Sequence, residues 1–135
     1  MTDPAAVAAT IRDTHVEVVA AVERVAARVA REWPAAGPAD GRRVATELEA
    51  ALGAAGLFDR LPALLETATD RLGATPVADP VAAPPYVVVT SRGPVLRATL
   101  PRRRVVVTLA VVEVEDGRYR SLGKVDIRVR CPERR

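Results

Sequence analysis

Residues 84–130 constrain the fold most, because this stretch contains nearly all of the strongly β-forming residues in the chain. Within it, Asp116-Gly117 lies between two runs of β-branched residues, and Asp-Gly favours the type I′ turn of a two-residue hairpin. That turn sets the register of the two strands around it. The predicted cross-strand pairs are Glu115 with Arg118 and Glu113 with Arg120, and opposite charges at such positions stabilise the pairing.

The same stretch predicts a β-meander of four antiparallel strands over residues 86–130. Residues 86–90 form a β-branched run, and Gly93 and Pro94 follow in a turn. Residues 95–100 alternate in polarity, as expected of a half-buried strand. Residues 105–112 are almost entirely apolar, which indicates a central strand that continues to the Asp116 turn. Residues 118–130 form the return strand.

Carrying this register along the sheet predicts two apolar surfaces. The first, named here the valine face, is a candidate self-association face and consists of Val106, Val112, Val114, Tyr119, Val125, Ile127 and Val129, with Ala110 beside them. The second consists of Val87, Val89, Leu96, Ala98, Leu100, Val105, Val107 and Leu109. If the helices cover one surface, the other is left apolar and exposed, and such patches commonly mark interaction sites. A bulge near Gly123 or in the arginine loop would instead exchange the faces and remove the patch.

Residues 3–73 predict three helices that pack on this sheet. Asp3-Pro4 begins a long helix that reaches Trp33, and its valine-rich stripe fits packing on the sheet better than an intermolecular coiled coil. Asp40 and Asp59 each begin a shorter helix, and the glycines at 56 and 73 end them. The proline-rich residues 74–85 form a connector, and residues 131–135 form a basic tail. We therefore predict one α+β domain over residues 1–135.

Charge is distributed unevenly along the chain. Residues 1–91 contain eight basic and twelve acidic residues, whereas residues 92–135 contain twelve basic and five acidic ones. Such asymmetry is typical of contact with nucleic acid or another acidic partner, although the two halves can also complement each other. The chain has a single lysine among twenty basic residues, a bias that GC-rich coding also explains.

The second half concentrates this charge in one set of side chains. The candidate anion-binding or nucleic-acid-binding residues are Arg102, Arg103, Arg104, Arg118, Arg120, Lys124, Arg128 and Arg130. Arginine binds phosphate through two parallel hydrogen bonds, which supports a nucleic-acid contact. The alternative is that these charges protect an exposed edge strand from aggregation.

The chain offers few groups for catalysis or metal binding. It has one histidine, His15, on the apolar stripe of the first helix, and one cysteine, Cys131, near the opposite end. This pair does not make a metal site, and the single cysteine excludes an intrachain disulfide. No apolar run of membrane-spanning length and no signal peptide are visible. We expect a cytoplasmic protein that is not an enzyme and needs no cofactor, metal or membrane.

The composition and the segment Ala83 to Leu100, APPYVVVTSRGPVLRATL, resemble small uncharacterised proteins of haloarchaea. The resemblance covers mainly the first hairpin and implies a cytoplasmic protein of unknown function, with no functional residue carried over. Our prediction is a non-enzymatic interaction module that forms a homo-oligomer or binds a protein partner. The alternative is nucleic-acid or polyanion binding through the arginine loop and last strand.

Overall fold

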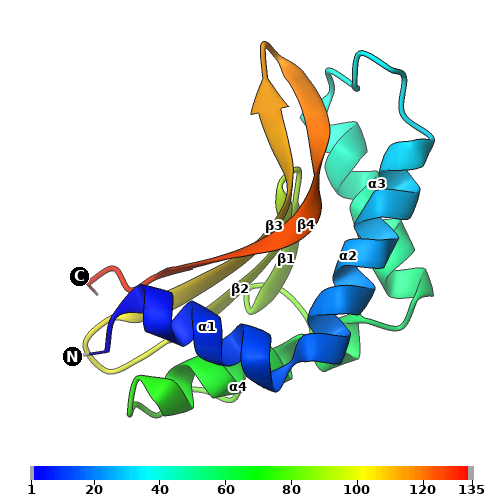
Figure 1. The fold of residues 1–135 in the computed structure, drawn as a ribbon. Helices are drawn as coiled ribbons and strands as arrows, with labels where there is room; N and C mark the ends of the chain where they lie inside the picture. Colours follow the sequence, from blue (N-terminus) through cyan, green and yellow to red (C-terminus); the bar gives the residue numbers. More distant parts are fainter. Residues whose placement is uncertain (1, 134–135) are drawn as a thin grey trace.

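A computed structural model describes residues 2–133 and confirms the α+β class (Figure 1). In the described part of the chain, four α-helices and a short 3-10 helix precede four β-strands. The helices are α1 (Pro4–Thr14), α2 (Val16–Arg31), α3 (Gly41–Ala54) and α4 (Pro62–Arg71), with η1 (Phe58–Arg60) before α4. The strands are β1 (Val87–Thr90), β2 (Gly93–Thr99), β3 (Arg104–Glu115) and β4 (Arg118–Arg130).

The predicted first helix is two helices. The chain leaves helical geometry at His15, whose φ of −117° and ψ of 43° separate α1 from α2, and α2 ends at Arg31, before Trp33. The break turns the two helices toward different neighbours, since α1 packs on α4 while α2 packs on α3. Both helices also contact β4. Packing against different neighbours therefore divides one predicted apolar stripe between two helices.

The second helix begins as predicted, and the third does not. The Asp40 side chain accepts hydrogen bonds from the backbone amides of Arg42 (3.0 Å) and Arg43 (3.4 Å), which is the N-cap arrangement of α3. Asp59 instead lies inside η1, and α4 starts at Pro62. Gly56 and Gly73 follow the two helices with φ of 69° and 68°, the left-handed conformation expected of glycine at a helix end.

The sheet has the predicted meander order β1-β2-β3-β4, with antiparallel neighbours. Asp116 and Gly117 both have positive φ, 52° and 74°, as a type I′ turn requires. The register beside this turn is also confirmed. Glu113 lies opposite Arg120, and Glu115 lies opposite Arg118.

Further from the turn the predicted register is wrong, because a large bulge interrupts the pairing of β3 with β4. Between the pairs Ala110 with Asp126 and Val112 with Ser121, β3 has one residue and β4 has four. Gly123, with φ of 71°, lies in this longer segment. Beyond the bulge the pairing is displaced by an odd number of residues, so the sides of the two strands are exchanged.

The bulge divides the valine face between the two sides of the sheet. Val125 and Ile127 are buried in the helix-facing core together with Val112, and Val129 and Tyr119 pack against it. Val106 pairs with Arg130 on the opposite side and is not part of that core. Val114 lies opposite Tyr119, beyond the bulge. The predicted continuous apolar surface therefore does not form.

The helices lie on one side of the sheet, and the core fills the layer between them. On the sheet side, this layer contains the second predicted apolar surface. Val89 is only partly buried there, and the other residues of that surface are buried. From α2 it includes Val18, Val22 and Val25, so the valine stripe of this helix packs inside the domain. Residues 74–85 connect α4 to β1 without helix or strand. Arg134 and Arg135, part of the predicted basic tail, lie outside the described residues.

Candidate nucleic-acid interface

The other side of the sheet, named here the open face, carries four of the arginines of the strands. Its residues follow from the cross-strand pairs, since directly paired residues share a face. They are Val88, Thr90, Val95, Arg97, Thr99, Arg104, Val106, Thr108, Ala110, Asp126, Arg128 and Arg130. Four arginines and one aspartate give this face a formal charge of about +3 at neutral pH.

Apolar side chains form the floor of the open face. Val95 and Val106 are each 6% exposed and Ala110 is fully buried, yet none of the three belongs to the helix-side core. Long arginine side chains can cover such residues with their methylene groups while their charged ends remain in water. The open face therefore combines exposed arginines with buried apolar residues between them.

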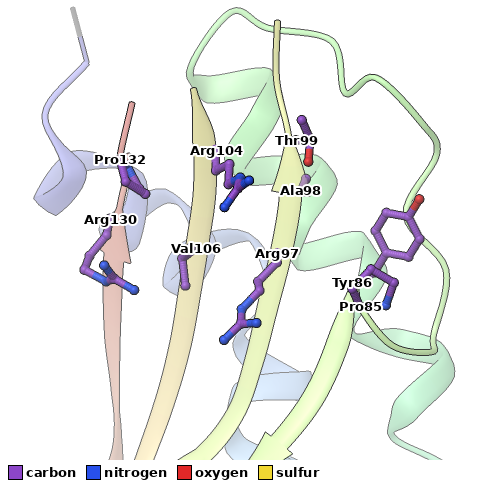
Figure 2. Close-up of a pocket in the computed structure, with 9 residues that line it drawn as sticks. All are labelled: Pro85, Tyr86, Arg97, Ala98, Thr99, Arg104, Val106, Arg130 and Pro132. Atoms are coloured by element: carbon purple, nitrogen blue, oxygen red, sulfur yellow. The ribbon is translucent and has the colours of Figure 1, made fainter. Parts of the chain in front are cut away.

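A pocket of about 440 Å³ opens on this face at the end near the β2–β3 loop (Figure 2). Its charged residues are Arg97 on β2, Arg104 on β3 and Arg130 on β4, and Figure 2 shows these three side chains around Val106. The register explains the arrangement, because Val106 lies directly between Arg97 and Arg130. The remaining lining residues are Pro85, Tyr86, Ala98, Thr99 and Pro132.

The three pocket arginines have no acidic partner in the described part of the chain. Residues 2–133 form two salt bridges, which join Arg43 to Glu47 and Arg128 to Asp126. The Arg128 bond, 2.9 Å between Nε and Oδ2, neutralises the fourth arginine of the open face. Positive charge is therefore left uncompensated at the pocket and compensated beside it.

The comparisons with known proteins show the family of this chain. A family model described as a domain of unknown function, DUF7988, matches residues 5–132. The chain belongs to the DUF7988 family. No curated protein and no solved structure matches it. The family description agrees with the expectation of unknown function, and the haloarchaeal origin stays a prediction.

This DUF7988 chain brings together only part of the predicted arginine set. Arg104 and Arg130 meet in the pocket, and Arg128 shares the open face in a salt bridge. Arg102 and Arg103 are at the same end of the sheet but line a different hollow with Thr2, Pro4, Cys131 and Glu133. Lys124 is in the bulge segment of β4.

Arg118 and Arg120 lie at the far end of the sheet, beside the Asp116 turn, and Arg118 has a structural partner. Its Nη1 donates a hydrogen bond to the carbonyl oxygen of Gly37 (3.1 Å), and the neighbouring amide of Tyr119 donates to Pro38 (2.9 Å). These bonds attach the hairpin tip to the loop between α2 and α3. The register places Arg118 opposite Glu115 and Arg120 opposite Glu113. No salt bridge joins either arginine to a glutamate in residues 2–133.

Arg97 is not among the arginines predicted from the sequence to form the candidate site. The available signal was its position as the one charged residue in an alternating strand, on the side opposite Leu96 and Ala98. Its proximity to Arg130 could not be inferred, because the two residues meet only through the displaced register of β4.

The remaining reactive groups lie elsewhere. His15 Nε2 is 2.7 Å from the hydroxyl oxygen of Thr67, and burial lowers the pKa of His15 from its ordinary value of 6.5. Cys131 is partly buried. Across residues 2–133, no group of three or more His, Cys, Asp or Glu side chains is placed to hold a metal ion. No helix in the same range has the length and apolarity to cross a membrane.

Proposed function

We propose that this DUF7988 protein is a non-enzymatic binding module whose open face holds single-stranded nucleic acid. The observation that carries the proposal is the pocket formed by Arg97, Arg104 and Arg130, three arginines with no acidic partner among the described residues. Guanidinium groups bind phosphate oxygens through paired hydrogen bonds.

Self-association through the valine face has less support. Its apolar residues are divided between two sides of the sheet, and most of them contribute to the core of a single chain. Two open faces brought together would place eight arginines near two aspartates, and like charges in contact oppose association. A partner of opposite charge fits this face better than a second copy of it.

The three arginines and Tyr86 in the pocket lining favour nucleic acid over an acidic protein. Base stacking on aromatic rings and arginine planes tolerates any sequence, and Tyr86 is the aromatic residue of the pocket lining. A peptide carboxylate needs only one arginine fork, whereas three arginines around one apolar residue suit a group with several oxygens.

Fluorescence anisotropy with a labelled single-stranded DNA tests the proposal. Replacement of Arg97, Arg104 and Arg130 by alanine should weaken binding at least tenfold. The control replaces Arg42, Arg60 and Arg71, three exposed arginines of the helical part, and thus changes the net charge equally. It should bind like the parent protein, because its substitutions are remote from the open face.

A salt titration of the same complex adds an independent measurement. If the three arginines neutralise phosphate charge, log K should fall as the log of the salt concentration rises, with a slope between about −0.7 for one neutralised phosphate and about −2 for three. Equal loss in the control variant, or a binding constant insensitive to salt, would contradict the proposal. Equal affinity for polyglutamate would replace nucleic acid by an acidic protein as the partner.

A further inference from the structure

The three pocket arginines surround one point and do not follow a line. Arg97 and Arg130 flank Val106 on the neighbouring strands, so their Cα atoms are about 9.6 Å apart, two strand spacings. Arg104 precedes Val106 by two residues on the same strand, a displacement of about 6.6 Å. An arginine side chain is long enough to reach the space above Val106 from each of these positions. The three guanidinium groups can therefore contact one small anion together.

Charge does not continue from the pocket as a track along the sheet. The next arginine on β4, Arg128, is bonded to Asp126. Toward the hairpin tip, Glu113 and Glu115 lie opposite Arg120 and Arg118, so positive and negative groups alternate. A strand bound by its whole backbone would need cationic groups at regular intervals along its path. The open face supplies them at one end.

The pocket fits a terminal phosphate better than a phosphate within a strand. A phosphate monoester carries a charge of about −1.5 to −2 at pH 7 and three terminal oxygens. A phosphodiester within a strand carries a single negative charge and two such oxygens. Three arginines can each direct a donor at a different oxygen of the monoester, and the diester leaves one guanidinium without an oxygen of its own.

We infer that the Arg97–Arg104–Arg130 pocket binds the phosphate at the end of a single-stranded nucleic acid. The inference rests on the proposed function and narrows it from any stretch of the strand to its phosphorylated end. Tyr86 lines the same pocket, at its edge beside the start of β1. Thr99, also in the lining, adds a hydroxyl group near the arginines.

The test compares oligonucleotides of one sequence that differ only at their ends. The full chain is titrated with three forms, which carry a 5′-phosphate, a 3′-phosphate or hydroxyl groups at both ends, each labelled at the same internal nucleotide. We expect at least tenfold tighter binding of one phosphorylated form than of the hydroxyl form. A nucleoside monophosphate serves as a competitor in a separate arm.

Two single substitutions on β4 provide a matched pair. Arg130→Ala should remove the preference for the phosphorylated end, and Arg128→Ala should retain it. Both positions are exposed and share a strand and a face, but Arg128 is already bonded to Asp126. Circular dichroism is used to check that both variants fold.

The outcomes separate this inference from the function on which it rests. Equal, arginine-dependent binding of all three oligonucleotides would overturn the terminal site and retain strand binding. No binding of any form would overturn both. A nucleoside monophosphate that binds as tightly as the phosphorylated oligonucleotide would overturn the assignment to a strand end, since the pocket would then recognise a free nucleotide.

Discussion

At the scale of single residues, the position of His15 in the fold affects its protonation. It is the only histidine of the chain, and it lies at the break between α1 and α2. The hydroxyl of Thr67 donates to the carbonyl oxygen of Ala63 (3.2 Å), so its oxygen is left to accept from Nε2–H of His15. This bond is made by the neutral ring. A second proton would place a charge on a group that burial has partly removed from water.

The lowered pKa of His15 makes the stability of the fold depend on pH. In the unfolded chain His15 binds a proton at its ordinary pKa, 6.5, and in the folded chain only at a lower pH. As pH falls below 6.5, the unfolded state therefore takes up more protons and the free energy of unfolding decreases. Urea unfolding between about pH 7.5 and 5.5, above the range of ordinary carboxyl groups, should show this decrease.

A substitution isolates the contribution of this one side chain. His15→Gln removes the titrating group and keeps a side chain that can hydrogen bond to Thr67. Its free energy of unfolding should be nearly constant over the same pH range. If the parent protein is equally insensitive to pH, the linkage assigned to His15 is wrong.

At the scale of elements, the bulge in β4 is stabilised by two side chains from the helices. The carboxylate of Glu23 on α2 accepts a hydrogen bond from the amide of Val125 (3.1 Å), and Arg12 on α1 donates to the carbonyl oxygen of Val125. Both backbone groups of Val125 are thereby satisfied where the pairing with β3 is interrupted. The helices thus stabilise the bulge. The bulge in turn determines which side chains of β4 lie on the open face.

Loss of the Glu23 carboxylate should destabilise β4 at Val125. Glu23→Ala leaves the Val125 amide without an acceptor, which should lower the free energy of unfolding by about 1–3 kcal/mol. Hydrogen exchange should be faster at the Val125 amide than in the parent protein. Glu23→Gln keeps an acceptor oxygen and should recover most of the protection.

A neighbouring glutamate supplies the control. Glu17 is exposed on the same helix, and its replacement by alanine should leave exchange at Val125 unchanged. Unchanged exchange in Glu23→Ala would show that another group holds the bulge.

At the scale of the whole molecule, the helices cover one side of the sheet (Figure 1). The arginines of the open face lie on the other side. The large apolar side chains most exposed in residues 2–133 are Val16, Val77 and Val81, the first at the start of α2 and the others in the connector. Single exposed valines of this kind are usual on a monomer and do not form a docking surface.

We expect a monomer across a wide concentration range at low salt. Four arginines on the open face repel a second copy of the same face, and the apolar residues of the valine face are mostly buried within one chain. Light scattering on a sizing column measures the molar mass directly. A dimer that forms at low salt and dissociates as Arg97, Arg104 and Arg130 are replaced would instead assign the open face to self-association.

Much of the architecture could be predicted from the sequence, because it depends on neighbouring residues. The meander order, the Asp116-Gly117 turn, the Asp40 cap and the central position of β3 all follow from local backbone preference and period-2 polarity. The candidate arginines were also found in part, since two of the three pocket residues, Arg104 and Arg130, were named in advance.

The tertiary structure decided the features that depend on distant residues. The break at His15 lets two helices pack on different neighbours, and the bulge opposite Val111 exchanges the sides of the sheet beyond it. Strand pairing has a period of two, so the three extra residues of β4 move every later side chain to the other face. Local patterns therefore determined which strands form and in what order. The contacts of Val125 with Glu23 and Arg12, made across about a hundred residues, helped decide which arginines share a surface.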